Sequence, residues 1–468
     1  MERTERNTDL LLNYGKSIKI SSNKSLFVPL NILMNYTDIL IIGAGATGLM
    51  AARTLANAGK KVIVLEARER CGGRIHTLNS ELLFKNAELG AEFIHGDLPV
   101  TLNLLKQAGI SYYSASAAMW QYKDGKFKQE SEQIEGWDLL IKALKKLEQD
   151  ISIDNFSQKY FQDDKYKELR NFVRKFVSGY DTADPRSASA FALMKEWENE
   201  DAGAQHRIIG GYQVMIKYLE DELINNNGHI YLNSVAKDIS LKQGDVEVKT
   251  GNGEIYSAKQ ILIALPLGVL QQGENKKGAL TFTPPIPEHS KALKAMGFGA
   301  VIKVLLEFDD LFWEDEATHA LAGKSLKNMG YLLSDEEIPT WWTQFPQHSP
   351  VFTGWIGGPA AAEKKDVPDE EILKQSLESL SNIFSRKTEE LKEKLLSYKI
   401  MNWTAEPFTR GSYAYDTVAA PESRKVLNTP IENTLFFAGE YLYEGIAMGT
   451  VEAALTSGEE IAKRMIGS

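Results

Sequence analysis

Cysteine is nearly absent from this chain of 468 residues, in which Cys71 is the single example. One cysteine excludes an intramolecular disulfide and a dithiol redox pair, and it favours a reducing compartment such as the cytoplasm. Histidine is also scarce, with seven residues, and these show no metal-ligand spacing. We therefore expect neither a disulfide framework nor a metal centre.

Long apolar runs and excess positive charge are also missing. No run of roughly 18 apolar residues occurs, so the sequence predicts no membrane-spanning helix and no stable membrane anchor. A formal net charge of −10 argues against a nucleic-acid partner. Residues 1–36 show neither clear periodicity nor the basic, apolar, small-residue order of a signal peptide, so we expect a flexible extension there. The length of the remaining chain predicts two or three globular domains.

The stretch from Asp38 to Thr77 is the most informative part of the sequence. It begins with an apolar run, Ile39–Ile42, that is typical of a strand buried on both faces. A glycine-rich turn follows, then a small-residue helical pattern over Leu49–Ala58 and a second apolar run over Val62–Leu65. This order predicts the strand–turn–helix–strand unit that binds dinucleotides.

Each glycine of the turn has a physical role in such a unit. Gly43 permits the tight turn, Gly45 permits close approach of a pyrophosphate, and Gly48 lets the helix pack on the strand. Ala46 and Thr47 lie in the turn just before the helix, whose N-terminal N–H groups attract phosphate. Glu66 follows Gly48 by 18 residues, at the end of the second strand, where a carboxylate can accept both ribose hydroxyls.

The next segment, E-A-R-E-R-C-G-G-R, extends from Glu66 to Arg74. Adjacent glycines let backbone amides form an anion nest, and Arg74 can neutralise a pyrophosphate. The segment resembles the flavin-containing amine oxidase family, in which it lies beneath FAD. The resemblance therefore implies FAD as the cofactor.

A second matching segment, E-L-G-A-E-F-I-H-G, runs from Glu88 to Gly96 and is most similar to the polyamine oxidase branch of that family. In relatives it follows the flavin ring, and Gly90 and Ala91 leave room for a flat ring. Phe93 replaces a tryptophan that is usual there. Taken alone, His95 fits a loop histidine, but the resemblance favours a role in the active site.

Further segments complete the implied FAD site. The residue matching Val235 meets the adenine through its backbone, the Gly439-Glu440 strand end holds the ribityl and phosphate groups, and the last helix begins at the pyrimidine end of the ring. Together the FAD-binding residues are Gly43, Gly45, Ala46, Thr47, Gly48, Glu66, Ala67, Arg68, Gly73, Arg74, Gly90, Ala91, Glu92, Phe93, Val235, Trp403, Gly439, Glu440, Thr450 and Val451.

Lys303 interrupts the apolar run Val301–Phe308. Alternation along a strand places Lys303 on one face with Val301 and Leu305, which favours a buried functional cation over a solvent-facing residue. By resemblance, Lys303 hydrogen-bonds a water near flavin N5. Lys303 and His95 are thus the candidate catalytic residues.

Three residues are expected to contact the substrate. By resemblance, Tyr413 forms one wall of an aromatic sandwich, whereas Ile446 replaces the tyrosine of the opposite wall in monoamine oxidases. Glu92 is placed to pair with a distal ammonium group or to hydrogen-bond the loop backbone. Ser412 replaces the cysteine that tethers FAD in covalent relatives, so we expect non-covalent FAD.

The predicted fold class is α/β, with a Rossmann-like FAD-binding domain of the amine oxidase type interleaved with an α+β substrate-binding domain. Residues 37–96, 207–285 and 400–468 are assigned to the FAD-binding domain. Residues 97–206 and 286–399 are assigned to the substrate-binding domain, in which Glu370–Lys399 is expected to be one long amphipathic helix with a solvated charged face.

The implied reaction is oxidation of a primary or secondary amine to an imine and then an aldehyde, with O2 reduced to H2O2. A polyamine or long aliphatic amine is favoured over an aromatic monoamine. An L-amino acid oxidase would need an arginine soon after Ala91, and a carotenoid- or porphyrinogen-type dehydrogenase would not be expected to have Lys303 and the Ile-His-Gly sequence. A flavoprotein scaffold similar to the histone demethylase relatives is a further alternative. The oligomeric state stays open.

Overall fold

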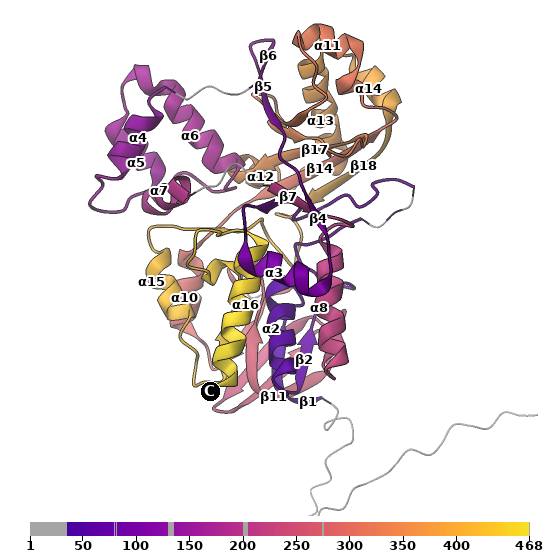
Figure 1. The fold of residues 1–468 in the computed structure, drawn as a ribbon. Coiled ribbons are helices and arrows are strands. Elements are labelled where there is room, and N and C mark those ends of the chain that lie inside the picture. Colours follow the sequence, from indigo (N-terminus) through magenta and orange to yellow (C-terminus); the bar gives the residue numbers. More distant parts are fainter. Residues whose placement is uncertain are drawn as a thin grey trace, which may run out of the picture.

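The computed structural model describes residues 35–78, 80, 82–129, 135–199, 205–273 and 276–467. Of the flexible extension predicted for residues 1–36, only Asn35 and Tyr36 lie within these residues, and Tyr36 begins the first strand. Figure 1 shows three regions: a sheet covered by helices at the bottom, a second sheet with helices at the upper right, and a helical group at the upper left.

The lower sheet contains the glycine-rich turn at the end of its central strand. Its strands lie in the order β12 (Thr281–Thr283), β9 (Ala236–Lys242), β10 (Asp245–Thr250), β11 (Ile255–Ile263), β1 (Tyr36–Ile42), β2 (Val62–Leu65) and β8 (His229–Tyr231), and β20 (Leu435–Phe437) also pairs with β11. β1 is parallel to β2 and β11, with Ile41 opposite both Val64 and Leu262. The carboxyl ends of these strands therefore meet at one edge, where open α/β sheets bind ligands.

Helices cover both sides of this sheet (Figure 1). On one side, Leu49, Met215 and Leu455 join the core that contains Ile41; the helices are α2 (Ala46–Asn57), α3 (Pro99–Ala108), α8 (Gln213–Asn225) and α16 (Val451–Ile466). On the other side pack α9 (Leu267–Leu270), α10 (Pro287–Ala295) and α15 (Ala420–Leu427). These cores fix the sheet edge relative to the helices that begin there.

The second sheet lies on the side of the molecule opposite the lower sheet (Figure 1). Its order is β18 (Leu395–Asn402), β14 (Val301–Phe308), β17 (Val351–Gly357), β16 (Thr340–Trp342), β15 (Met329–Ser334), β5 (Ala118–Lys123) and β6 (Lys126–Gln129). Near it lie α11 (Glu316–Ala322), α12 (Gly358–Glu363), α13 (Asp369–Phe384) and α14 (Thr388–Lys394) (Figure 1). Ile302, Val304 and Leu306 of β14 point into the core with α13, which leaves Lys303 on the other face.

Smaller elements connect these layers. A three-stranded sheet joins β3 (Ile94–His95), β7 (Gln205–Ile208) and β4 (Tyr112–Ser114), and β13 (Gly297–Phe298) pairs with β19 (Ala414–Tyr415). The helical group comprises α4 (Trp137–Leu144), α5 (Ile153–Tyr160), α6 (Lys167–Gly179) and α7 (Ala190–Asn199). Short 3-10 helices also occur at η1 (Asp164–Tyr166), η2 (Phe312–Glu314) and η3 (Glu440–Leu442).

The prediction of one long helix over Glu370–Lys399 is wrong. α13 ends where Ser385 takes a left-handed conformation with φ of 51°, and after the short α14 the chain becomes β18. β18 pairs with β14 from Ile302 to Phe308. Strand pairing with β14 therefore determines the structure of this segment, although its charge pattern is typical of a helix. The predictions of strands over Ile39–Ile42 and Val62–Leu65 are confirmed.

Candidate active site

One cavity of about 1190 Å³ extends from the glycine-rich turn to the face of the second sheet. It exceeds the roughly 300–1,000 Å³ of most small-molecule sites, so it has room for a dinucleotide and a substrate. Of the residues predicted from sequence to form the site, all but Gly48 line it. These are Gly43, Gly45, Ala46, Thr47, Glu66, Ala67, Arg68, Gly73, Arg74, Gly90, Ala91, Glu92, Phe93, His95, Val235, Lys303, Trp403, Tyr413, Gly439, Glu440, Ile446, Thr450 and Val451.

The glycine-rich turn forms one end of the cavity. Gly43 has φ of 106°, and a Cβ atom there would lie 2.6 Å from the Ala264 carbonyl oxygen. A Cβ atom at Gly48 would lie 1.9 Å from the Gly43 carbonyl oxygen, so Gly48 serves packing behind the cavity wall. A Cβ atom at Gly45 would meet nothing within 4 Å. Gly45 therefore leaves open space in front of the first turn of α2, as a bound pyrophosphate requires.

Glu66 is buried beside this turn. Its Oε2 accepts a hydrogen bond of 2.8 Å from the Ala44 backbone N–H, and its Oε1 accepts one of 2.9 Å from the Arg68 backbone N–H. The carboxylate is thereby fixed at the end of β2. A carboxylate oxygen has more than one acceptor site, so Glu66 can still accept hydrogen bonds from a ribose.

Arg74 and Glu440 connect the early and late parts of the chain. The guanidinium donates two hydrogen bonds, of 2.8 and 2.7 Å, to the two oxygens of Glu440, and a third of 2.7 Å to the Ser412 carbonyl. Although burial alone would raise it, the Arg74 charge holds the pKa of Glu440 below its usual value. Because the pair is bidentate and Glu440 is buried, it fixes Gly73 and Gly439 beside the cavity.

The backbone at Gly90 is packed too closely for any side chain. A Cβ atom there would lie 1.8 Å from the Arg74 carbonyl oxygen. Trp403 supports the same segment by donating a hydrogen bond of 2.8 Å to the Leu89 carbonyl. At another part of the wall, the Val235 carbonyl accepts a hydrogen bond of 2.8 Å from Gly251. These contacts hold main-chain segments, rather than side chains, against the cavity.

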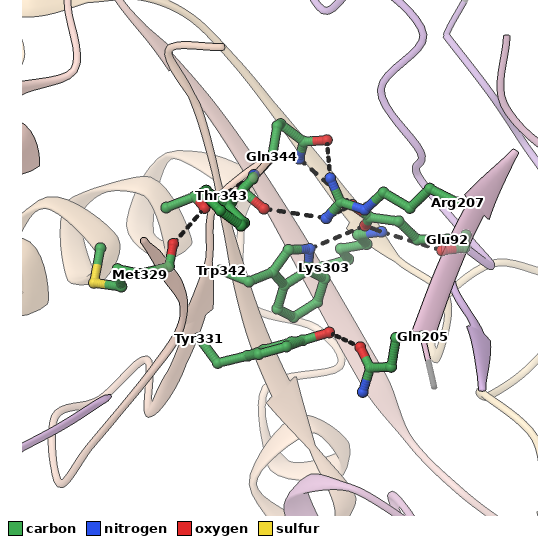
Figure 2. Close-up of polar contacts among 11 residues, drawn as sticks. Glu92, Gln205, Arg207, Lys303, Met329, Tyr331, Trp342, Thr343 and Gln344 are labelled. Carbon is green, nitrogen blue, oxygen red and sulfur yellow. Dashed lines mark hydrogen bonds and ion pairs between the residues drawn. The ribbon is translucent and has the colours of Figure 1, made fainter. Parts of the chain in front are cut away.

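Lys303 reaches the cavity from the middle of β14, and its side chain is 1% exposed. Its ammonium group donates a hydrogen bond of 2.7 Å to Glu92 Oε2 and one of 3.1 Å to the Gly90 carbonyl (Figure 2). Its Nζ also lies 5.2 Å from the centroid of the Trp342 ring. The structure thus places Lys303 as a buried cation, as predicted from its strand face.

Both carboxylate oxygens of Glu92 already have protein partners. This arrangement revises the expectation that Glu92 pairs with a substrate ammonium group. Oε2 accepts from Lys303 and, at 3.0 Å, from the indole N–H of Trp342, whereas Oε1 lies 2.8 Å from Arg207 Nη2 (Figure 2). Burial alone would raise the pKa of Glu92, but the charges of Lys303 and Arg207 lower it. A carboxylate already neutralised by two cations offers little attraction to a third.

Aromatic rings form much of the remaining wall. The His95 ring lies 5.7 Å from Phe93 and 6.1 Å from Tyr180, centroid to centroid. Burial lowers the pKa of His95 to about 4, so this histidine is neutral near neutral pH. Tyr413 donates its hydroxyl to the Tyr180 carbonyl, while Ile446 is 56% exposed at the cavity rim.

Sequence reasoning missed many cavity and network residues, among them Arg207, Tyr331, Trp342 and Trp355. Arg207 comes close to Glu92 because β7 pairs with β3, with His206 opposite Ile94. The tryptophans lie on neighbouring strands, with ring centroids 5.8 Å apart. The Trp341-Trp342 pair in a short strand was the available signal, since one of two adjacent strand residues must face away from the core.

The sequence predicted neither a metal centre nor a membrane-spanning helix. Within the described part of the chain, no group of three or more histidine, cysteine, aspartate or glutamate side chains is arranged to hold a metal ion. Among the same residues, no helix combines the length and apolar character needed to cross a bilayer. Cys71, the single cysteine, is buried.

The residues present fit FAD. The open space at Gly45 adjoins the N-terminus of α2, and Glu66 stands at the end of the next strand. The cavity continues from there past Arg74 and Gly90 to Lys303 and Tyr413. An elongated dinucleotide cofactor matches this order of features: the open loop suits its pyrophosphate, the carboxylate suits its ribose, and the side-chain-free backbone suits its flat ring.

Comparison with known proteins agrees with this geometry. The sequence model of the family described as flavin containing amine oxidoreductase matches residues 46–466. Lysine-specific histone demethylase 2 of Homo sapiens is 28% identical over 91% of this chain and 53% of its own length, so the chain spans about half of that relative. Polyamine oxidase 2 of Arabidopsis thaliana is 27% identical over 92% of this chain and 89% of its own length.

Solved structures show the same fold. Putrescine oxidase bound to putrescine has a TM-score of 0.74 at 20% identity, with 92% of this chain and 99% of that chain covered. Cyclohexylamine oxidase from Brevibacterium oxydans IH-35A has a TM-score of 0.73 at 18% identity, covering 92% and 99%. The predicted fold class is therefore confirmed. The chain belongs to the flavin-containing amine oxidoreductase family, and its cofactor is FAD.

Proposed function

We propose that this chain oxidises a primary or secondary amine to an imine, which water converts to an aldehyde, with O2 reduced to H2O2. The observation that supports this most is the continuous cavity that joins the dinucleotide turn to Lys303, His95 and Tyr413. Such a cavity allows an amine to lie against the ring of a dinucleotide cofactor. FAD supplies the hydride acceptor and passes the electrons to oxygen.

The side chains of the cavity are suited to hold the amine. Aromatic rings exclude water from the reacting end, and the neutral His95 neither repels a substrate cation nor adds charge. Lys303 lines the same wall and is proposed to orient a water beside the flavin. We assign Tyr413 and Ile446 to the substrate side.

A polyamine or long aliphatic amine is the favoured substrate class. Ile446 leaves one side of the proposed aromatic sandwich without a ring, which reduces the advantage of an aromatic amine. Carboxylates other than Glu92 also line the cavity, among them Asp97, Glu336 and Glu444, and they favour a substrate with a second ammonium group. The similarity to polyamine oxidases supports the same choice.

An aromatic or cyclic monoamine is the alternative. Phe93, Tyr331, Trp342 and Trp355 give the inner cavity broad apolar walls. A methylated lysine side chain is a second alternative, because histone demethylases are among the similar proteins. An L-amino acid oxidase has the least support, since Arg207 is already paired with Glu92.

A panel of amines tests the substrate class. We expect kcat/KM for spermidine, spermine or putrescine to exceed that for benzylamine, tyramine and phenethylamine by about tenfold, the size of one ammonium–carboxylate contact. Peroxide release is the readout, and a methyllysine peptide completes the panel. Ile446→Tyr restores a second aromatic ring, so kcat/KM for benzylamine should rise relative to kcat/KM for the polyamines. A tenfold preference for an aromatic amine in the wild type would replace the polyamine assignment with the monoamine one.

The mode of FAD binding gives a simpler prediction. Ser412 is buried, and its hydroxyl lies within hydrogen-bond distance of the Thr182 hydroxyl, so no thiol is present at the position that tethers FAD in covalent relatives. Acid or heat denaturation should release all of the FAD into the supernatant, as measured by flavin absorbance. Flavin that sediments with the polypeptide would contradict this prediction.

The domain boundaries and the compartment remain proposals. We assign residues 37–96, 207–285 and 400–468 to FAD binding and residues 97–206 and 286–399 to the substrate side. The single cysteine favours a cytoplasmic location. Substrate amine and O2 are the proposed partners.

A further inference from the structure

We propose that Glu92 is a positioning residue, which holds the Lys303 ammonium group at the cavity wall and is itself held by Arg207. The proposal depends on the proposed amine oxidation, in which Lys303 acts beside the flavin. It changes the role of Glu92 from a substrate contact to a support for another residue.

The hydrogen bonds of Lys303 define its direction. An ammonium group has three N–H donors, and two of them point to Gly90 O and Glu92 Oε2. Both acceptors belong to one short segment, which also lines the cavity. Among the described residues these are the hydrogen-bond partners of Nζ, so the third donor is left for a water or ligand inside the cavity. The Gly90–Glu92 segment thereby sets the position of Lys303 relative to whatever lies along that segment.

Arg207 keeps the Glu92 carboxylate from turning away. Its Nη2 lies 2.8 Å from Glu92 Oε1 and donates to the Thr343 carbonyl at 3.1 Å, while its Nη1 donates to Gln344 Oε1 at 2.9 Å (Figure 2). Its guanidinium carbon also lies 4.5 Å from the Phe93 ring centroid. None of these contacts depends on Lys303, so Arg207 is a fixed anchor for Glu92.

The charges explain why the carboxylate is needed. Lys303, Arg207 and Glu92 are 1%, 5% and 7% exposed, so little solvent screens them. Without Glu92, two buried cations would face each other with no anion between them, and the flexible lysine would be the one to move. With Glu92, each cation has its own carboxylate oxygen.

A purely structural ion pair would not need this placement. Buried ion pairs are weak evidence for stability, because apolar side chains of similar volume often serve as well. Lys303 and Glu92 line the cavity instead of closing a core. This location favours a role in orienting the cation towards a ligand.

The experiment compares Glu92→Gln, Lys303→Met and the double variant in their FAD-loaded forms. The bound flavin is reduced with dithionite, and its reoxidation by O2 is then timed, so that no amine is required. We expect Glu92→Gln to slow reoxidation roughly 10- to 100-fold, the size of losing a charge-assisted hydrogen bond. The double variant should be no slower than Lys303→Met alone. FAD affinity of the apoprotein, measured by flavin fluorescence, should change less than about threefold.

Glu88→Gln is the matched control. Glu88 is a buried carboxyl group of the same segment, it accepts a hydrogen bond of 2.6 Å from the Tyr212 N–H, and it does not line the cavity. The same substitution there should leave reoxidation at the wild-type rate. If Glu92→Gln fails to fold, Glu92→Asp keeps the charge, shortens the side chain and should still slow reoxidation.

Several outcomes would overturn the proposal. They are wild-type reoxidation in a folded Glu92→Gln or Glu92→Asp variant, further slowing of Lys303→Met by Glu92→Gln, and wild-type reoxidation in Lys303→Met. The proposed amine oxidation fails by a different result, namely that no amine reduces the wild-type flavin. The two failures are therefore distinguishable.

Discussion

Lys303→Met is expected to slow the oxidation of amines and the reoxidation of the flavin by roughly 10- to 100-fold while leaving FAD content unchanged. Methionine keeps similar bulk but has no N–H donor for a water in the cavity. Glu92 would keep Arg207 and Trp342 as partners, so the carboxylate would not become an unpaired buried charge. We therefore expect a loss in the free energy of unfolding of only about 1–3 kcal/mol.

Lys399→Met is the control for this prediction. Lys399 lies on the neighbouring strand β18, directly opposite Leu305, and is exposed. It should keep wild-type rates in both half-reactions, which are followed separately by anaerobic and aerobic stopped-flow absorbance. Unchanged rates in Lys303→Met would assign Lys303 to structure alone.

Glu66→Ala is expected to weaken FAD binding by about 1–3 kcal/mol, or roughly 5- to 150-fold in Kd. The variant loses the proposed ribose contact. It also loses the hydrogen bonds that Glu66 accepts from the backbone N–H groups of Ala44 and Arg68. The loop in front of the pyrophosphate would then be less well ordered before binding, which adds to the cost.

The measurement is titration of apoprotein with FAD, followed by flavin fluorescence. Glu69→Ala is the control, because Glu69 is an exposed carboxylate three residues later and does not line the cavity. Equal FAD affinities of the wild-type and Glu66→Ala apoproteins would show that Glu66 does not bind FAD.

Local sequence patterns predicted the dinucleotide unit well. The apolar runs Ile39–Ile42 and Val62–Leu65 lie within β1 and β2, and the glycine constraints at Gly43 and Gly48 hold in the structure. These features depend on backbone sterics and burial over a few residues, so a single sequence contains the needed information. The strand face of Lys303 was predictable for the same reason.

Contacts between distant segments were not predictable. Nothing near Glu92 in the sequence indicates that Arg207, 115 residues later, and Trp342, 250 residues later, would occupy its oxygens. The pairing of β7 with β3 brings Arg207 there, and strand pairing of this kind follows from the whole fold. The end of the helix at Ser385 was missed because the Glu/Lys spacing around it is typical of a helix. The later residues form β18 because they pair with β14, which is distant in the sequence.

Anaerobic addition of an amine to the FAD-loaded protein tests the central claim most directly, because it asks whether this cavity delivers electrons from an amine to the flavin. We expect spermidine, spermine or putrescine to bleach the flavin absorbance in the absence of oxygen, and admission of air to restore it with release of peroxide. A correctly folded, FAD-loaded protein whose flavin stays oxidised with every amine of the panel would contradict the account.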